Sequence, residues 1–377
     1  MKVVIAIDSF KGSLTSIQAC NAAKEAVKTV FSDAEIITVP IADGGEGTAI
    51  AYFIALGGRI EKVMVTSPEF KQIEASYTIL PDNTAVIEMA EASGLTLVKG
   101  EKNAGEATSY GTGELINFAL NKGCRNFIIG LGGSATNDGG VGALSALGVR
   151  FLDKDGKTIK PNGNGIEKLY SIDTGKMLPL LSKCKFTIAC DVENTLCGRK
   201  GATYIYGEQK GVSGNDYERL DNNLLRFATI VKNTTNKDIL NIKGGGAAGG
   251  MCAGLMSFLN ATTESGIKLL LDRINFEELI SDCDFIISGE GKVDSQTAYG
   301  KVISGIGEYA KKAGKPFIVV AGQLADGYEA VFEKGVTSAF CITHYAMPFE
   351  NIKHRAEKDL FDTVKNIGYL IKTINNI

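Results

Sequence analysis

The first sixty residues repeat one order of apolar patterns. A continuous apolar run over residues 2–7 predicts a buried strand. Apolar positions three and four residues apart over 14–30 predict a helix, with Ser13 at its N-cap position. A second strand over 35–41 leads into a short helix that ends near residue 56. Strand, loop and helix in this order, given twice, predict a parallel sheet.

The same order returns near the C-terminus. The pattern predicts three further strands, over residues 284–288, 316–321 and 338–343. Helices are expected between and after them, at about 300–312, near 330 and over 351–373. With the two N-terminal strands this makes five parallel strands, which indicates an α/β fold with one Rossmann-like (flavodoxin-like) sheet.

The middle of the chain does not keep this order. Residues 60–90 alternate polar and apolar positions, which is typical of short antiparallel strands with one face in water. Residues 216–232 have the spacing of an amphipathic helix. We therefore expect a Rossmann-like domain made of residues 1–60 plus 263–377, with a second, α+β domain of residues 61–262 inserted into it.

Composition excludes several classes of protein. The 377 residues carry 40 Lys+Arg against 43 Asp+Glu, a formal net charge of −3, which argues against a nucleic-acid partner. The sequence contains neither an unbroken apolar run long enough for a membrane span nor the pattern of a signal peptide. Eight cysteines without a CxxC pair fit reduced thiols in a cytoplasmic protein, and two histidines are too few for a histidine-rich metal centre.

Glycine is unusually frequent, with 45 residues, and it gathers in five clusters at predicted strand ends. The clusters are DSFKGS (8–13), ADGGEGT (42–48), GLGGSATNDGG (130–140), KGGGAAGG (243–250) and GEGKVDSQT (289–297). Ligands of parallel sheets bind at the carboxyl ends of the strands. Glycine lets the backbone approach a ligand, and loop amides before a helix favour anions. The clusters therefore favour a phosphate-binding site, although no Walker A sequence is present.

Charged residues in or beside the clusters are candidates for chemistry. Lys11 precedes a predicted helix and could reach a transferred phosphoryl group, or lie in solvent. Asp191 follows the apolar run FTIAC and is either a general base or a turn cap. Asp43, Asp138 and Asp294 lie in glycine loops as Mg²⁺ ligands, substrate contacts or turn-forming residues.

These segments, taken in order, resemble the type I glycerate kinase family. The resemblance rests on DSFKGS, ADGGEGT, GLGGSATNDGG, the DVxN stretch at Asp191, GAAGG and GEGKVDSQTAYGK, and runs from residue 1 to about residue 350. Two positions depart from the family pattern, since Ile7 and Thr195 each stand where the family has proline. Both departures flank charged positions rather than replace them.

The resemblance implies ATP-dependent phosphorylation of D-glycerate at its 2-hydroxyl, in a cleft between two domains. On this basis Asp191 is expected to be the base and Lys11 the cation at the migrating phosphoryl group, with ATP and Mg²⁺ as cofactors and the three aspartates near the metal. The expected substrate- and phosphate-binding residues are Asp8, Ser9, Gly44, Gly45, Glu46, Gly132, Gly133, Ser134, Thr136, Asn137, Asn194, Gly289, Gly291, Gln296, Thr297 and Lys301.

Two alternatives stay open at the level of the sequence. One is phosphorylation of the 3-hydroxyl of glycerate, or of another small hydroxy acid. The other is a non-catalytic protein that binds a phosphorylated metabolite in the same loops. The four aspartates around the predicted ligand favour an enzyme, because a passive anion binder has no use for them.

Overall fold

The computed structural model describes residues 1–42, 44–298 and 302–374. The chain forms two compact units, one made of Met1–Asp43 and Ile267–Ile377 and the other of Gly44–Gly266. The sequence analysis set the corresponding boundaries at 60/61 and 262/263. The difference at the first boundary concerns the helix α2 (Thr48–Leu56), which packs on strands of the second unit.

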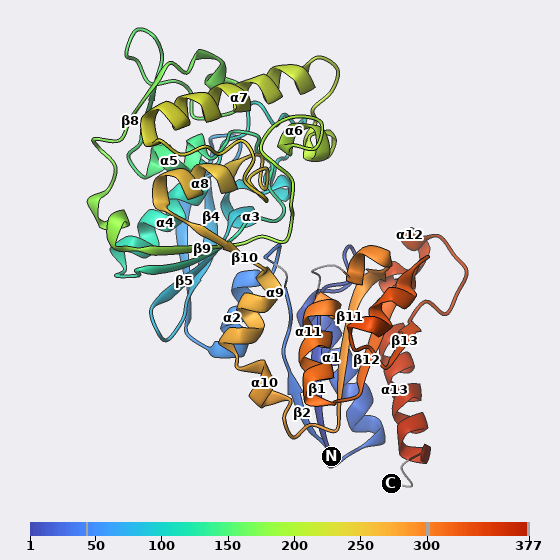
Figure 1. Cartoon of the computed structure of the whole chain (residues 1–377). Coiled ribbons are helices and arrows are strands. Elements are labelled where there is room, and N and C mark those ends of the chain that lie inside the picture. Colours follow the sequence, from blue (N-terminus) through green and yellow to red (C-terminus); the bar gives the residue numbers. More distant parts are fainter. Residues whose placement is uncertain (43, 299–301, 375–377) are drawn as a thin grey trace. The chain divides into compact units, whose positions relative to one another are not determined.

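The first unit contains a five-stranded sheet in which every pair of neighbouring strands is parallel (Figure 1). The order is β13-β12-β11-β1-β2. The strands are β1 (Lys2–Ile7), β2 (Glu35–Thr38), β11 (Phe285–Val293), β12 (Phe317–Leu324) and β13 (Ser338–Cys341). All five strands that the apolar runs predicted are therefore present, and β11 continues five residues beyond its predicted end.

Helices cover both faces of this sheet. Alternate residues of β1, such as Val3 and Ile5, join the apolar core beneath α1 (Ser16–Val30) and α13 (Ala356–Ile374). The other face packs on α11 (Val302–Ala313), where a Cβ on Gly307 would touch the ring of Phe317 at 3.5 Å. Three shorter helices are α9 (Gly266–Arg273), α10 (Phe276–Leu279) and α12 (Phe349–Ile352), and the predicted helix near residue 330 is the 3₁₀ segment Tyr328–Lys334.

The N-cap of α1 differs from the prediction. Thr15, not Ser13, caps the helix, because its side chain accepts a hydrogen bond from the amide of Gln18 and the Gln18 side chain accepts one from the amide of Thr15. The hydroxyl of Ser13 donates instead to the carbonyl of Phe10 at 2.9 Å. Ser13 therefore closes a turn that the glycine cluster makes before the helix begins.

The second unit contains a six-stranded mixed sheet in the order β10-β9-β6-β5-β4-β3. Its strands are β3 (Arg59–Thr66), β4 (Gln72–Ile79), β5 (Thr84–Glu88), β6 (Asn126–Gly130), β9 (Lys185–Ala189) and β10 (Thr262–Glu264). The predicted antiparallel arrangement is correct for β3 and β4. It is wrong for β5 on one side, because β5 pairs parallel with β6 and all its residues are buried.

Helices and a small two-stranded sheet complete the second unit around one large apolar core. The helices are α2, α3 (Met89–Ser93), α4 (Tyr110–Asn121), α5 (Val141–Ala146), α6 (Ala202–Tyr206), α7 (Asp216–Thr235) and α8 (Met251–Leu259). The small sheet pairs β7 (Arg150–Leu152) with β8 (Ser171–Asp173). The predicted helix over 216–232 is present as α7.

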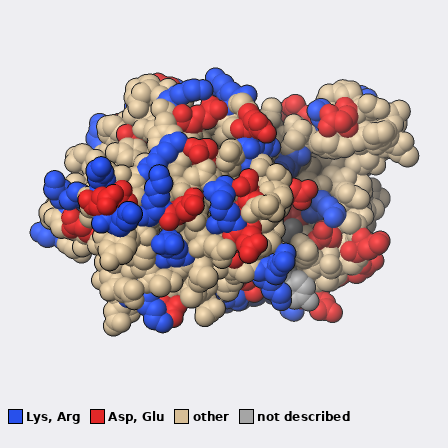
Figure 2. Space-filling model, turned by 90° about the horizontal axis from the view of Figure 1, so that it is seen from above, with Lys and Arg blue, Asp and Glu red and all other residues tan. Residues whose placement is uncertain are grey.

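Two further observations concern membrane spans and surface charge. Over the described part of the chain, we find no helix with both the length and the apolar character that a bilayer span requires. Figure 2 shows acidic and basic side chains interspersed over the face in view, in keeping with the net charge of −3.

Candidate functional site

In the first unit, the first glycine cluster starts at the carboxyl end of β1 and meets the last cluster within β11. Ile7 pairs with Gly289 in the sheet, and the amide of Asp8 donates to the carbonyl of Gly289 at 2.9 Å. A Cβ on Gly291 would lie 3.3 Å from the amide nitrogen of Lys11. The close approach of the two segments therefore places the exposed Lys11 beside the GEG segment.

The GEGKVDSQT cluster is a strand followed by a tight turn rather than a loop throughout. The buried Glu290, in β11, accepts a hydrogen bond from the hydroxyl of Thr297 at 2.9 Å. Asp294 accepts from the amide of Gln296 at 2.9 Å and forms an ion pair with Lys292 at 3.1 Å. Asp294 thus shapes this turn, which is one of the roles that the sequence left open for it.

In the second unit, the clusters around residues 44 and 130 are in direct contact. The amide of Gly132 donates to the carbonyl of Gly44 at 3.2 Å. A Cβ on Gly130 would lie 2.6 Å from that carbonyl oxygen, and a Cβ on Gly132 would lie 2.5 Å from the Cα of Gly45. Since both distances are shorter than real Cβ contacts, only glycine allows this approach. Glu46, next in the chain, is exposed.

The third glycine cluster of this unit, residues 243–250, contacts the cluster of residues 130–140. The amide of Gly139 donates to the carbonyl of Gly249 at 2.9 Å, and a Cβ on Gly249 would overlap the carbonyl of Thr136. The amide of Gly246 donates to the carbonyl of Asn194 at 2.9 Å. Residues 44–47, 130–140, 191–194 and 243–250 therefore form one group, which we call the second-unit loop cluster.

Asp191 lies in this cluster, two residues beyond the end of β9, and its side chain is exposed. Its Oδ2 accepts a hydrogen bond from the amide of Gly266 at 3.1 Å, which orients the carboxylate. Asn194 is held by two side-chain contacts, donating to the carbonyl of Lys200 at 2.9 Å and accepting from the hydroxyl of Tyr206 at 2.6 Å. An exposed, oriented carboxylate is suited to accepting a proton from a substrate.

Asp138 has a different environment. Its side chain is fully buried, and its carboxylate accepts hydrogen bonds from the amides of Ser109, Gly140 and Gly142 and from the hydroxyl of Ser109. Burial raises the pKa of Asp138, and these hydrogen bonds oppose that effect. Because its oxygens serve donors within the fold, the geometry favours a role in shaping the loop over the expected role as a metal ligand.

Two of the expected site residues, Asp43 and Lys301, lie outside the described residues. Within residues 1–42, 44–298 and 302–374, no three His, Cys, Asp or Glu side chains are grouped so that they could hold a metal ion. The described residues therefore do not form a metal site of three or more such side chains, and we derive no step through one.

Lys210 is a residue that the sequence analysis missed. It ends the 3₁₀ segment Glu208–Lys210, and its side chain is only 3 % exposed. Its Nζ donates to the hydroxyl oxygen of Ser134 at 2.7 Å and to the carbonyl oxygen of Thr136 at 2.8 Å. Burial lowers the pKa of Lys210 to about 7, against the opposing charge of Asp138. A buried lysine directly behind a glycine loop is unusual and points to a role in that loop.

Glu88, at the end of β5, was also missed. Its carboxylate accepts hydrogen bonds from the amides of Gly47 at 2.9 Å and Ala49 at 2.6 Å, at the start of α2. Burial raises the pKa of Glu88 to about 7, although both hydrogen bonds act to lower it. The residue thus connects the loop around Gly44 to the sheet of the second unit.

Glu88 gives a prediction for stability. Because its pKa in the folded protein is raised to about 7 from 4.5, the folded state holds a proton that the unfolded state releases between these values. The free energy of unfolding should therefore fall by up to roughly 3 kcal/mol as pH rises from 4.5 to 7. Denaturant titrations of the wild type and Glu88→Gln over this range should show the decline in the wild type and a flatter profile in the variant. Parallel profiles would contradict the assignment.

Three comparisons with known proteins all find that this chain is similar to glycerate kinases. The model of the glycerate kinase family matches residues 3–372. A glycerate kinase of Halalkalibacterium halodurans is 44 % identical over 368 residues, covering 97 % of each chain. A glycerate 2-kinase of Escherichia coli is 45 % identical over 344 residues, covering 91 % of this chain and 90 % of that protein. A crystal structure described as a glycerate kinase 2 from Salmonella typhimurium LT2 superposes with a TM-score of 0.88 at 40 % identity, over the full length of both chains.

The fold is therefore a mixed α/β fold of the kind seen in that crystal structure. The chain belongs to the glycerate kinase family, whose model spans nearly all of it.

Proposed function

We propose that this protein is an ATP-dependent kinase that phosphorylates D-glycerate on its 2-hydroxyl to give 2-phosphoglycerate. The observation that carries the proposal is the family match over residues 3–372. Two relatives named glycerate kinase, 44 % and 41 % identical to this chain, support it. The position of transfer is supported by the relative of Escherichia coli, which is named glycerate 2-kinase.

The proposal includes the domain arrangement. The first unit, with its parallel sheet in the order β13-β12-β11-β1-β2, is a Rossmann-like domain in our interpretation. The second unit is an α+β domain inserted between β2 and β11 of the first. DSFKGS follows the carboxyl end of β1, and GLGGSATNDGG follows that of β6, where ligands of parallel sheets bind. The expectation of a strand end is wrong for KGGGAAGG, which follows α7, and GEGKVDSQT begins inside β11.

The chemistry asks for a base, a cation and amide donors. We assign proton acceptance from the 2-hydroxyl to Asp191 and neutralisation of the migrating phosphoryl group to Lys11. The amides of Gly133 and Ser134 and the hydroxyl of Ser134 are assigned to anionic oxygens of the substrates, whereas the amide of Gly132 donates to the carbonyl of Gly44. The side chains of Thr136 and Asn137 are buried, which favours a supporting role within the loop for both.

Mg²⁺ enters the proposal as an ion that the ATP phosphates carry. Of the three aspartates expected near it, Asp294 is the one that is both described and not buried. When bound, the metal would neutralise phosphate charge. The protein side chains are assigned to binding, orientation and proton acceptance only.

A coupled assay for glycerate-dependent release of ADP tests the proposal. The purified protein with ATP, Mg²⁺ and D-glycerate should release ADP in proportion to the glycerate consumed. ADP release that does not depend on glycerate, or no release, would contradict a glycerate kinase and favour the phosphometabolite binder. Replacing D-glycerate by other small hydroxy acids in the same assay tests the acceptor, and we expect D-glycerate to give the highest kcat/KM.

A further inference from the structure

Two backbone amides of the GLGGSATNDGG loop are unpaired within the part of the chain that the structure describes. Among the described residues, the amide nitrogens of Gly133 and Ser134 have no hydrogen-bond acceptor, whereas the carbonyl of Gly133 accepts from the amide of Leu95 at 2.8 Å. The amide of Ala135 donates to the carbonyl of Ser93 at 2.9 Å, so the loop is held on both sides of Ser134. Gly133 is exposed and has a φ of 72°, a left-handed conformation that favours glycine.

Lys210 determines what the Ser134 hydroxyl can do. A serine hydroxyl has one hydrogen to donate and two lone pairs to accept with. Since Nζ of Lys210 donates to the Ser134 oxygen at 2.7 Å, the hydroxyl hydrogen is left for a different acceptor. Ser134 keeps 8 % of its surface exposed, next to the exposed Gly133. The hydroxyl and the two amides are thus three donors on two neighbouring residues of the loop.

Lys210 has no ion-pair partner among the described residues. Both hydrogen-bond acceptors of its Nζ are neutral, and the negative charge of Asp138 acts on it without an ion pair or a hydrogen bond. Burying an ammonium group that is not directly paired lowers stability. A ligand that brings negative charge to Ser134 would compensate for this cost.

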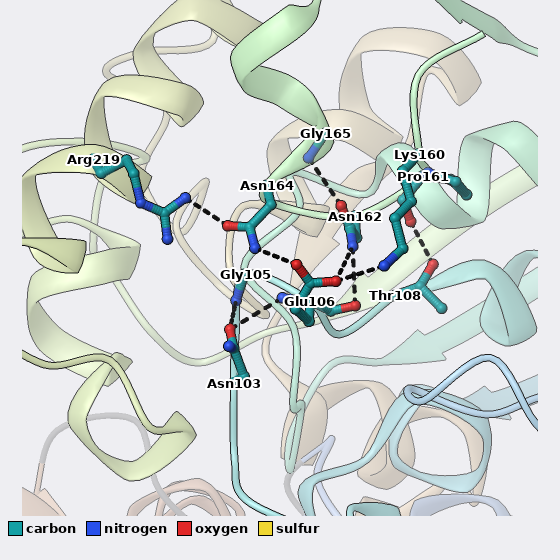
Figure 3. A network of polar contacts seen from close by, with 10 residues as sticks. All are labelled: Asn103, Gly105, Glu106, Thr108, Lys160, Pro161, Asn162, Asn164, Gly165 and Arg219. Atoms are coloured by element: carbon teal, nitrogen blue, oxygen red, sulfur yellow. Dashed lines mark hydrogen bonds and ion pairs between the residues drawn. The ribbon is translucent and has the colours of Figure 1, made fainter.

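A polar network around Glu106 lies next to this site in the sequence of contacts, and Figure 3 shows its residues. Glu106 is its centre and accepts from Lys160, Asn162 and Asn164, while Arg219 of α7 donates to Asn164 at 2.6 Å. The network closes the segment around residue 104 against residues 160–165.

Ala104, in that segment, connects Lys210 to the loop through its backbone. Its amide donates to the carbonyl of Lys210 at 3.1 Å, and its carbonyl accepts from the amide of Asn137 at 3.3 Å. Ala104 therefore links the backbone of Lys210 to that of Asn137, three residues beyond Ser134.

We propose that Gly133, Ser134 and Lys210 form an oxyanion-binding site, in which Lys210 is a positioning residue that orients and polarises the Ser134 hydroxyl. The ligand is an anionic oxygen, either of the ATP phosphates or of the glycerate carboxylate. The identity of these two sources rests on the proposed function.

Steady-state kinetics of Lys210→Met, Ser134→Ala and the double variant test the site, with KM measured separately for ATP and for D-glycerate. We expect each single variant to raise KM for one of the two substrates at least about tenfold, with a smaller change in kcat. The substrate whose KM rises identifies the ligand. The double variant should lose little more than the worse single variant, because Lys210 acts through Ser134.

Lys237→Met is the matched control. Lys237 also lies in the second unit and donates through Nζ to the carbonyls of Ser257 at 2.8 Å and Met256 at 3.3 Å, outside the second-unit loop cluster. This variant should lower thermal stability and leave both KM values at the wild-type level. Effects of Lys210→Met no larger than those of Lys237→Met, or additive effects in the double variant, would overturn the proposal. If Lys210→Met does not fold, the test rests on Ser134→Ala. Unchanged KM values for that variant would overturn the proposed oxyanion-binding site.

Calorimetric titration with tripolyphosphate and with D-glycerate separates this inference from the proposed function. If the wild type binds one of these anions and Ser134→Ala binds it at least about tenfold more weakly, the site stands even where the wild type transfers no phosphoryl group. If the wild type phosphorylates glycerate while both variants bind both anions as tightly as it does, the kinase stands and this site is wrong.

Discussion

Replacing Asp191 with asparagine is expected to lower kcat for glycerate phosphorylation at least about a hundredfold, with the fold intact. Asparagine retains the size of the side chain and an oxygen that can accept from the amide of Gly266, but it cannot take up a proton. The attacking hydroxyl would then have to lose its proton to water. The comparison requires kcat at saturating ATP and glycerate for both proteins, with thermal unfolding as the check on the fold.

Asp153→Asn is the control for this variant. Asp153 is in the same unit and accepts hydrogen bonds from the amides of Asp155 and Lys157 at 2.9 Å each, which is a turn-forming role. Its replacement should leave kcat within about twofold of the wild type, as is usual for residues far from the chemistry. A wild-type kcat in Asp191→Asn would remove Asp191 from the mechanism.

Replacing Lys11 with alanine is the second large expected effect, a loss in kcat of at least about a hundredfold. In phosphoryl transfer most of the catalysis is positioning and neutralisation of charge, so the loss of a cation at the migrating group acts on the transition state. Lys11 is exposed and follows Phe10 in the turn before α1, so the deletion of its side chain leaves the apolar core in place. Stability should therefore change little while kcat falls.

Lys28→Ala provides the comparison for Lys11. Lys28 is an exposed lysine in the last turn of α1, in the same unit, and its replacement removes the same charge from the protein. If the two variants had equal kcat values, the effect of Lys11 would be one of net charge, and the assigned role would be wrong.

The sequence was most informative where a pattern is local. The apolar runs predicted the five strands of the first sheet, most clearly for β1, β11 and β12, because a buried parallel strand is continuously apolar and short. The pattern misled at β5, where an alternation that is typical of a half-exposed strand belongs to a strand buried between β4 and β6. The position of a strand within a sheet depends on its neighbours, and these are distant in the sequence.

The residues of the candidate site also differ in whether the sequence alone could reveal them. The glycine clusters could be found because a close backbone approach requires glycine, as at Gly130 and Gly132. Lys210 could not be found from the sequence in this way. The segment around Ala104, which contacts it, lies over one hundred residues earlier in the chain. Glu88 could have been identified as a candidate from the sequence, because it comes directly after an apolar run, much as Asp191 does.

Phosphorus NMR of the reaction products tests the central claim most directly. The protein, incubated with ATP, Mg²⁺ and D-glycerate, should produce the resonance of 2-phosphoglycerate as that of the γ-phosphate of ATP declines. The appearance of 3-phosphoglycerate would contradict the assigned position of transfer, and inorganic phosphate without any phosphoglycerate would contradict a glycerate kinase.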